Sequence, residues 1–274
     1  MPPYTHAMHH ELPTFETLQL SQDGPHILVV TLNRPEVGNA ISTRMGQELL
    51  DLWTRLTAEP GALRCVVLTG AGGRIFCSGA DLKERRGMDR AQWQHQHELF
   101  ERAYWAMVDL PLPLVGAVNG HAYGGGVELM LCCDFAYASA AARFAFTEVT
   151  LGIMPGMGGT QTLPRALGER RAKELLLTGR AFDAAQALEW GLVNAVHAPE
   201  EALPRALETA RQIADNAPLA VRQIKKSVRY GGQMELRTAF RFEVEAYNHL
   251  VDTDDRREGV AAFNEKRKPV FTGR

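Results

Sequence analysis

Short apolar runs alternate with longer helical patterns along most of the chain, and this alternation constrains the fold more than any other feature. The run ILVVTLN at residues 27–33 is rich in β-branched residues and stops at Arg34-Pro35, which predicts a strand. Further strands are predicted at residues 64–70, 112–120, 135–139 and 143–149, and helices at residues 42–58, 89–110 and 124–134. Ser42 and Asp89 are the expected N-caps of the first two helices. This order predicts an α/β fold in which crossover helices connect the strands.

The last quarter of the chain has no strand candidate. Helices are predicted there at residues 199–217, 218–230, 233–252 and 254–268. We therefore divide the chain into a flexible leader at residues 1–13, an α/β core at residues 14–198 and a helical segment at residues 199–274. The histidines of the leader, His6, His9 and His10, fit a mobile terminal segment better than a metal site, and no metal is expected.

Composition narrows the possible partners and the compartment. Lys+Arg 30 against Asp+Glu 32 gives a net charge of −2, which offers no electrostatic footprint for nucleic acid. The 4 cysteines lack C-x-x-C spacing and have apolar neighbours, as expected of free thiols in a reducing compartment. No apolar run approaches the ~18 residues of a membrane span, and the first residues lack a signal-peptide pattern. We therefore expect a cytoplasmic protein with no nucleic-acid or membrane partner.

The stretch YGGGVELML at residues 123–131 places three glycines directly before an apolar run that contains one acid, Glu128. It follows a buried strand candidate, so the glycines lie at a helix N-terminus, where N–H groups lack intrahelical partners. These features suit an oxyanion hole, and a phosphate cradle is the competing interpretation. Glu128 could simply complement the helix dipole, but its apolar neighbours predict a poorly solvated acid with a raised pKa.

A second loop, FCSGADLKER at residues 76–85, follows the strand predicted at residues 64–70. Gly79 permits close backbone approach, although a plain turn into a helix capped by Asp81 would explain the same residues. A nucleotide site is not supported, because GAGGRIF at residues 70–76 lacks the last glycine of G-x-G-x-x-G. Ser78 does not lie inside G-x-S-x-G, which weakens a serine hydrolase interpretation.

A third loop, at residues 143–168, carries Glu148 at the end of a strand candidate and before a glycine-rich turn. Read alone, Glu148 could be a strand-edge carboxylate that faces water. Glu128 and Glu148 would meet if the strand at residues 143–149 lay beside the helix start at residue 124. Two carboxylic acids in different environments suit paired acid and base chemistry.

The three loops, in this order, resemble the crotonase superfamily, also called the enoyl-CoA hydratase/isomerase family. The resemblance covers nearly the whole chain after residue 13, through LNRPE (32–36), NA (39–40), FCSGADLKE (76–84), AVNGHAYGGGVEL (117–129), FTEVTLGIMPGMGGTQTLPRALG (146–168), ELLLTGRAFDAAQALEWGLVN (174–194) and EGVAAFNEKRKPVF (258–271). It implies a crotonase-like spiral of ββα turns with a C-terminal helical segment that assembles a homotrimer, or a hexamer as a dimer of trimers. It also implies an acyl-CoA substrate and no separate cofactor, because coenzyme A is part of the substrate.

The resemblance also implies roles for single residues. The backbone N–H groups of Ser78 and Gly125 would form the oxyanion hole that holds the thioester oxygen. Glu128 and Glu148 would hold the attacking water, with Glu128 as the base for water and Glu148 as the proton donor to Cα.

Coenzyme A itself would follow a path along Ala40, Ser78, Ala80 and Asp81, as the resemblance implies. Lys266 would meet the coenzyme A phosphates, in its own or a neighbouring subunit. A lysine in a basic tail is otherwise more often simply solvated.

One departure from the family pattern concerns the residues before Asn39-Ala40, where Val37-Gly38 stand in place of the usual basic residue. A phosphate contact from that loop is therefore not expected. GADLKER also occurs in relatives that act on branched dicarboxyl-CoA substrates, and such a substrate would need a basic acyl pocket. The basic residues that follow Asp81 could supply one or could lie on the surface: Lys83, Arg85 and Arg86.

The presence of both glutamates favours a 2-enoyl-CoA hydratase, a lyase of fatty acid metabolism that adds water across the Cα=Cβ bond. The alternatives that remain are a Δ3,Δ2-enoyl-CoA isomerase, a methylglutaconyl-CoA hydratase, and a non-catalytic acyl-CoA-binding or RNA-binding relative. Residues 85–105 and 150–160 are expected to line the acyl pocket.

Overall fold

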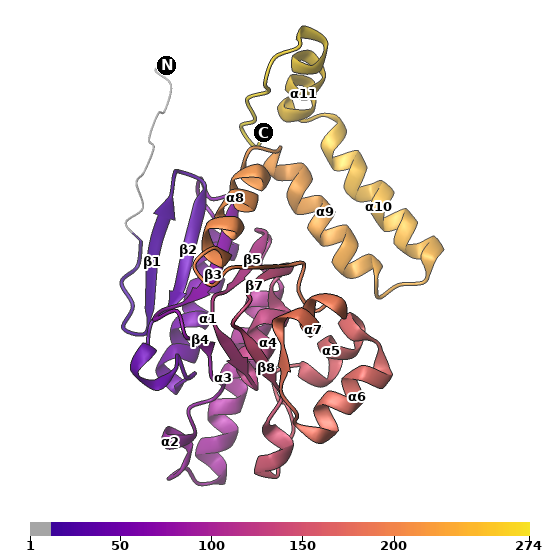
Figure 1. Ribbon diagram of the computed structural model, residues 1–274. Coiled ribbons are helices and arrows are strands. Elements are labelled where there is room, and N and C mark those ends of the chain that lie inside the picture. Colours follow the sequence, from indigo (N-terminus) through magenta and orange to yellow (C-terminus); the bar gives the residue numbers. More distant parts are fainter. Residues whose placement is uncertain (1–11) are drawn as a thin grey trace.

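The computed structural model describes residues 12–274, and Figure 1 shows how its elements are arranged. The predicted leader at residues 1–13 lies almost wholly outside this range, and its three histidines lie outside it entirely. Leu12, which the structure does describe, packs against the main hydrophobic core. Contact with the core therefore begins slightly before the boundary predicted at residue 14.

The larger of the two sheets has strands in the order β1-β2-β3-β5-β7-β10. Their bounds are Leu18–Asp23 for β1, Ile27–Leu32 for β2, Cys65–Gly70 for β3, Leu114–Val118 for β5, Phe135–Ser139 for β7 and Ala195–His197 for β10. β1 and β2 are antiparallel, and each other neighbouring pair in this sheet is parallel. β2, β3 and β5 are buried almost throughout, so their apolar runs were recognisable in the sequence. β1 was not predicted, because its sequence, LQLSQD, alternates and contains no apolar run.

The smaller sheet has strands in the order β4-β6-β8-β9. Their bounds are Ile75–Cys77 for β4, His121–Tyr123 for β6, Arg143–Ala145 for β8 and Phe182–Asp183 for β9. Successive turns of the chain add one strand to each sheet: β3 and β4, then β5 and β6, then β7 and β8. This confirms the predicted α/β spiral of ββα turns. β4 and β6 have only 3 residues each, too few for a periodic pattern, and were not predicted.

Helices follow the strands of each turn and cover the sheets (Figure 1). Their bounds are Pro35–Val37 for η1, Thr43–Ala58 for α1, Leu82–Arg85 for α2, Arg90–Val108 for α3, Gly125–Cys132 for α4, Glu148–Leu151 for η2, Gly159–Leu167 for α5, Glu169–Thr178 for α6 and Ala184–Glu189 for α7. Ser42 accepts a hydrogen bond from the N–H of Met45, and Asp89 forms a capping box with Gln92. Both predicted N-caps are therefore confirmed.

The strand predicted at residues 143–149 is wrong over its second half. β8 ends at Ala145, and Glu148 begins the 3-10 helix η2. Thr150 explains the difference, because its N–H and its hydroxyl both donate to the carbonyl oxygen of Thr147, at 3.0 and 2.7 Å. The β-branched composition favoured a strand, but these local hydrogen bonds close a turn instead.

The C-terminal helices are α8 (Ala202–Ala214), α9 (Pro218–Gly231), α10 (Leu236–Val251) and α11 (Asp254–Glu265). α8 belongs to the core, because Ala206, Ala210 and Ala214 pack in a buried cluster with Val67 of β3 and Val115 of β5. α9, α10 and α11 form an extension, with α9 and α10 side by side (Figure 1). α9 still contacts the body, since Nζ of Lys225 lies 2.8 Å from Oδ2 of Asp134, whereas α10 and α11 lie further out. The helical segment predicted from residue 199 therefore contains one helix of the core and three of an extension.

The extension is tied back to the body at the start of β3. Arg64 donates to the carbonyl oxygens of Ala214, at 2.8 Å, and Phe271, at 2.7 Å. Cys65, Cys77, Cys132 and Cys133 are free and buried, as predicted. Within residues 12–274, no helix combines the length and the apolar character that crossing a membrane requires.

Candidate active site

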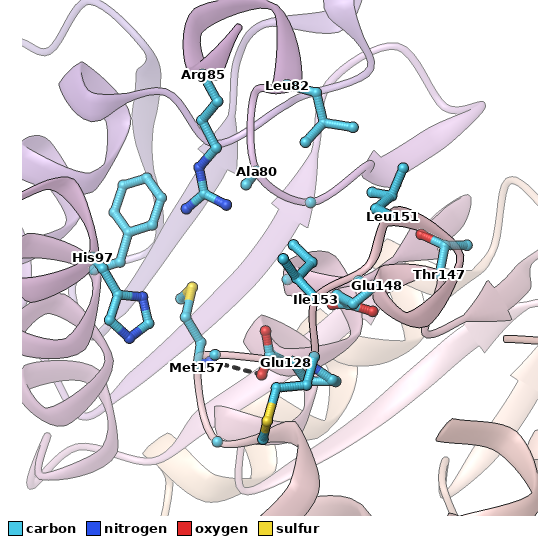
Figure 2. Close-up of a pocket in the computed structure, with 18 of the residues that line it drawn as sticks. Ala80, Leu82, Arg85, His97, Glu128, Thr147, Glu148, Leu151, Ile153 and Met157 are labelled. Atoms are coloured by element: carbon cyan, nitrogen blue, oxygen red, sulfur yellow. Dashed lines mark hydrogen bonds between the residues drawn. The ribbon is translucent and has the colours of Figure 1, made fainter. Parts of the chain in front are cut away.

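A cavity of about 660 Å³ lies between the three loops that the sequence singled out (Figure 2). Its lining residues come from the loop after β4, helices α2 and α3, the start of α4 and the segment from η2 to α5: Ser78, Gly79, Ala80, Leu82, Arg85, Trp93, Gln94, His97, Phe100, Gly124, Gly125, Glu128, Thr147, Glu148, Leu151, Ile153, Met154, Pro155, Gly156, Met157, Gly158, Thr160 and Gln161. The predicted acyl-lining segments, residues 85–105 and 150–160, both contribute to this cavity. The fold thus unites residues from three successive turns of the spiral.

The N–H of Ser78 is not available to a ligand, which corrects the predicted oxyanion hole. It donates to the carbonyl oxygen of Gly38 at 3.0 Å. The Ser78 hydroxyl lies 3.5 Å from the carbonyl oxygen of Val37, and no base contacts it among the described residues. A sequence motif identifies the segment, but only the direction of each peptide group shows which N–H remains free.

Ala80 carries the free N–H of this loop. It forms a parallel bridge with Ile41, in which the N–H of Ile41 donates to Gly79 at 2.8 Å and the N–H of Asp81 donates to Ile41 at 3.0 Å. Since the flanking residues make these bonds, the N–H of Ala80 points away from Ile41. Within residues 12–274 it has no hydrogen-bond acceptor.

Gly125 supplies a second free N–H on the opposite side of the same space. It is the first residue of α4, so its N–H has no intrahelical acceptor. A Cβ placed on Gly79 would lie 3.2 Å from the nitrogen of Gly125, and one placed on Gly125 would lie 3.8 Å from the nitrogen of Ala80. The two N–H groups therefore flank one small volume, which neither residue fills with a side chain.

The other glycines of the triplet are required by close packing. Gly126 lies so near β4 that an added Cβ would be 2.1 Å from the carbonyl oxygen of Cys77. Gly124 has a φ of +50°, and an added Cβ there would be 2.9 Å from Oε1 of Glu148. By contrast, the nearest atom to a Cβ on Gly125 would be Cδ1 of Ile41 at 3.5 Å, an ordinary contact. The protein itself therefore does not demand glycine at position 125.

Glu128 is 2% exposed and lies at the floor of the cavity (Figure 2). Its Oε1 accepts hydrogen bonds from the N–H groups of Met157, at 2.8 Å, and Gly159, at 2.7 Å. Burial is the main cause that raises the pKa of Glu128 to about 7; the two hydrogen bonds oppose the rise, and the charge of Glu148 contributes a smaller part of it. The raised pKa predicted from the apolar sequence around Glu128 is confirmed.

Glu148 is 9% exposed and also faces the cavity, beside Glu128 (Figure 2). Its Oε2 is buried and has no hydrogen-bond partner among the described residues, and burial raises the pKa of this acid. The interpretation of Glu148 as a water-facing acid at a strand edge is therefore wrong. The N–H of Gly124 donates to the carbonyl oxygen of Ala145 at 2.8 Å, so the two segments meet as predicted.

The remaining residues of the predicted coenzyme A path do not line the cavity. Asp81 caps α2, accepting hydrogen bonds from Lys83 and Glu84, and its Oδ2 lies 3.0 Å from Nη1 of Arg34. The same Nη1 donates to the carbonyl oxygen of Ala40 at 2.7 Å. Asp81, Arg34 and Ala40 thus hold the 78–81 loop in place through contacts outside the cavity.

Lys266 lies far from the cavity in the same chain. It ends α11 with a φ of +55° and is exposed. Figure 1 shows α11 at the opposite end of the molecule from α2, which borders the cavity. The structure of one chain therefore does not bring Lys266 to the site.

Sequence reasoning missed the backbone donors that hold Glu128. The motif MPGMGG at residues 154–159 signals a tight loop, but not that its N–H groups at Met157 and Gly159 point at an acid in another helix. Among residues 12–274, no group of three or more His, Cys, Asp or Glu side chains could hold a metal ion.

Comparisons with known proteins identify the fold and the family. The family description "Enoyl-CoA hydratase/isomerase" matches residues 23–274. An enoyl-CoA isomerase/hydratase of Mycosarcoma maydis is 40% identical over 252 residues, 89% of this chain and 92% of that protein. A short-chain-enoyl-CoA hydratase of Clostridium acetobutylicum is 39% identical over 242 residues, 88% of this chain and 92% of that protein.

A solved structure supports the same family. The crystal structure of an enoyl-CoA hydratase from Bacillus anthracis superposes with a TM-score of 0.92 at 42% identity, covering 94% of this chain and 100% of that one. The spiral fold with its cavity is thus that of a crotonase-type enzyme. The chain belongs to the enoyl-CoA hydratase/isomerase family, within the crotonase superfamily.

Proposed function

We propose that this enzyme is a 2-enoyl-CoA hydratase, which adds water reversibly across the Cα=Cβ bond of an enoyl-CoA thioester. The observation that carries the proposal is the meeting of two buried acids, Glu128 and Glu148, beside two free backbone N–H groups, those of Ala80 and Gly125. The names of the relatives from Mycosarcoma maydis and Clostridium acetobutylicum support the same chemistry.

The two N–H groups serve as the oxyanion hole. Attack of water at Cβ moves negative charge onto the thioester oxygen, and donors fixed in advance stabilise that charge without reorganising. The N–H groups of Ala80 and Gly125 flank a volume that contains no side chain, so the oxygen can reach both. Each donor of this kind typically contributes about 3–4 kcal/mol to the transition state.

The hydrogen bonds of the two acids suggest how they divide the proton transfers. Oε1 of Glu128 accepts two N–H donors, which favour the ionised form, so Glu128 is the base that removes a proton from water. Oε2 of Glu148 has no donor within the described chain, which favours the neutral form. Glu148 therefore delivers the proton to Cα. One proton then passes from Glu128 to Glu148, directly or through solvent, which restores both acids for the next turnover.

Crotonyl-CoA tests the proposal directly, because hydration removes the absorbance of its conjugated thioester. Glu128→Gln and Glu148→Gln should each lower kcat by on the order of 10²–10⁴-fold while the protein stays folded. Wild-type rates in both variants would contradict the two-acid mechanism. If Glu128→Gln lost hydration but still moved the double bond of a 3-enoyl-CoA, a single-base isomerase would replace the hydratase.

The helical extension is the proposed contact between subunits. α9, α10 and α11 expose large apolar side chains on a part of the chain that leaves the body: Ile224, Val228, Leu236, Phe240, Tyr247, Val260 and Phe263. Exposed apolar area of this extent favours burial against another protein surface, and a second copy of the chain is the occupant that we propose. A trimer or hexamer would then bring Lys266 of one subunit to coenzyme A bound by another.

A further inference from the structure

Arg85, the last residue of α2, directs a guanidinium group into the cavity (Figure 2). Its Nε donates to Oε1 of Gln96 at 2.7 Å. Within the described residues, neither Nη atom has a hydrogen-bond partner, and no carboxylate lies within ion-pair distance of the side chain. The outer edge of the guanidinium, which carries the two Nη groups, is therefore free.

The surroundings of Arg85 hold it in one orientation. Gln96 is 2% exposed, and its Nε2 donates to Oγ1 of Thr43 at 2.8 Å and to Oε2 of Glu84 at 3.1 Å. Those two bonds fix which end of the amide faces Arg85. The guanidinium carbon also lies 4.3 Å from the ring centroid of Trp93, a stacking distance for a planar cation.

Within the described residues, no carboxylate forms an ion pair with this cation. Glu84 acts on it only through space, and the Glu84 carboxylate already accepts from the N–H of Thr43 at 2.9 Å and from Nε2 of Gln96 at 3.1 Å. Burial lowers the pKa of Arg85, which is the expected cost of placing a positive charge among apolar groups. Trp93 and Phe100 flank the guanidinium, the latter with its centroid at 5.7 Å. An anionic group of a ligand would offset this cost.

We propose that Arg85 binds a carboxylate at the far end of the acyl group, so that the substrates are coenzyme A thioesters of unsaturated dicarboxylic acids. This inference rests on the hydratase activity proposed above and specifies its substrate class. The free guanidinium edge presents two parallel N–H donors, which match the two oxygens of one carboxylate. Lys83 and Arg86, the other basic residues of the segment, are exposed and do not line the cavity.

The surroundings of Arg85 indicate that it binds an anionic group of the acyl chain and not the phosphates of coenzyme A. Phosphates are strongly hydrated and carry several charges, whereas Arg85 is a single cation, half-buried between aromatic rings inside the cavity. The thioester site at Ala80 and Gly125 lines the same cavity as Arg85. One carboxylate, a few bonds from the thioester, suits this arrangement.

Glutaconyl-CoA and trans-2-pentenoyl-CoA provide a matched pair of probes, because they differ only in a terminal carboxylate in place of a methyl group. The wild-type enzyme should hydrate glutaconyl-CoA with a kcat/KM at least about 10-fold higher. Arg85→Gln should lower kcat/KM for glutaconyl-CoA by about 10- to 100-fold and change that for 2-pentenoyl-CoA by less than about 3-fold. Arg85→Lys should recover only part of the loss, because an ammonium group cannot pair with both oxygens.

Arg86→Gln is the control, since it removes the same charge from an exposed neighbour that does not line the cavity. It should leave the preference for glutaconyl-CoA unchanged. Equal losses for both substrates in Arg85→Gln would show that Arg85 binds the shared coenzyme A portion or supports the pocket, and would overturn the proposal. So would a wild-type preference for 2-pentenoyl-CoA.

Binding of saturated analogues separates this inference from the proposed reaction. Glutaryl-CoA should bind the wild-type protein about 10-fold more tightly than valeryl-CoA in isothermal titration, and Arg85→Gln should abolish the difference. This result without any hydration would refute the hydratase and leave carboxylate recognition standing. Equal affinity of the two analogues, with hydration intact, would refute carboxylate recognition alone.

Discussion

The N–H of Gly159 donates to Oε1 of Glu128 at 2.7 Å, and this bond joins the glycine-rich turn before α5 to the acid inside α4. Gly159 also leaves space for that acid, because a Cβ at this position would lie 3.0 Å from the same oxygen. One backbone group therefore orients Glu128, while the absence of a side chain keeps it accessible. The pH behaviour of the enzyme should follow from this acid.

The activity should rise with pH through the ionisation of Glu128. Burial raises the pKa of this acid to about 7, and Glu128 acts as a base only when ionised, so kcat/KM for crotonyl-CoA should show an ascending limb near pH 7. Glu148 donates its proton only while it is neutral, and a Gln amide at this position carries no charge either. In Glu148→Gln the ascending limb of the residual activity should therefore stay near pH 7. A limb that moves to lower pH would show that Glu148 is ionised while Glu128 titrates, and would contradict its role as the proton donor.

Glu128→Gln should make the folded protein more stable at neutral and alkaline pH. The folded-state pKa, about 7, exceeds the ordinary value of 4.5, so the native state holds this proton more tightly than the unfolded chain. Stability is therefore lost as pH rises from about 4.5 to about 7, by roughly 3 kcal/mol. Urea unfolding at pH 8 should show the gain in Glu128→Gln, and the gain should shrink towards pH 4.5. The exposed Glu98, changed to Gln, should show no such pH-dependent gain.

Alanine substitutions at two neighbouring glycines should have different effects: Gly125→Ala should reduce activity, and Gly126→Ala should reduce stability. In Gly125→Ala the new methyl group makes ordinary contacts with the protein but lies 3.8 Å from the nitrogen of Ala80, where the thioester oxygen must bind. The variant should keep its Tm and lose about 10²-fold or more in kcat.

Gly126→Ala should instead be destabilised by about 1–3 kcal/mol, because its Cβ would lie 2.1 Å from the carbonyl oxygen of Cys77. Thermal unfolding and crotonyl-CoA assays on both variants check the pair. Near wild-type activity in a folded Gly125→Ala would exclude Gly125 from the oxyanion hole.

Asp81→Asn should lower the free energy of unfolding, and the size of this loss should depend on pH. Burial works to raise the pKa of Asp81, but the N–H of Glu84, the side chain of Arg34 and the N–H of Lys83 together hold it below the ordinary 3.8. The stabilisation from the ionised form is therefore present above about pH 4 and is lost as pH falls further. We expect a loss of about 1–2 kcal/mol at pH 7 by urea unfolding. The difference from wild type should diminish in acid, and a constant difference would argue against an ionic origin.

Phe240→Asp should reduce the size of the assembly. Phe240 is 61% exposed on α10, so its replacement should cost the isolated chain little, whereas a buried aspartate would disrupt a contact between subunits. Sedimentation velocity should show a smaller species than the wild type. Arg241→Asp, at the exposed neighbouring position, controls for the change in charge. A wild-type protein that sediments as a monomer would refute the proposed contact.

The sequence allowed the central strands and the long helices to be predicted, because burial on both faces produces continuous apolar runs such as ILVVTLN. It did not allow β1, β4 and β6 to be predicted, since β1 alternates polar and apolar residues and the other two strands are very short. The two acids were predicted from their apolar surroundings and from the resemblance. The free N–H was misplaced by two residues, at Ser78 instead of Ala80, because the direction of a peptide group depends on pairing with Ile41 and leaves no trace in composition.

The backbone contact between Gly79 and Gly125 has a consequence for how this protein could change over time. The volume between the N–H groups of Ala80 and Gly125 is bounded by the main chain of Gly79 and Ala80 and by the side chain of Ile41, which belongs to neither α2 nor α3. Substitutions in α2 and α3, at positions such as Arg85 and Trp93, can therefore reshape the pocket without disturbing the anion-binding geometry. A directed-evolution library confined to those two helices should thus retain catalytic competence while it samples new acyl groups.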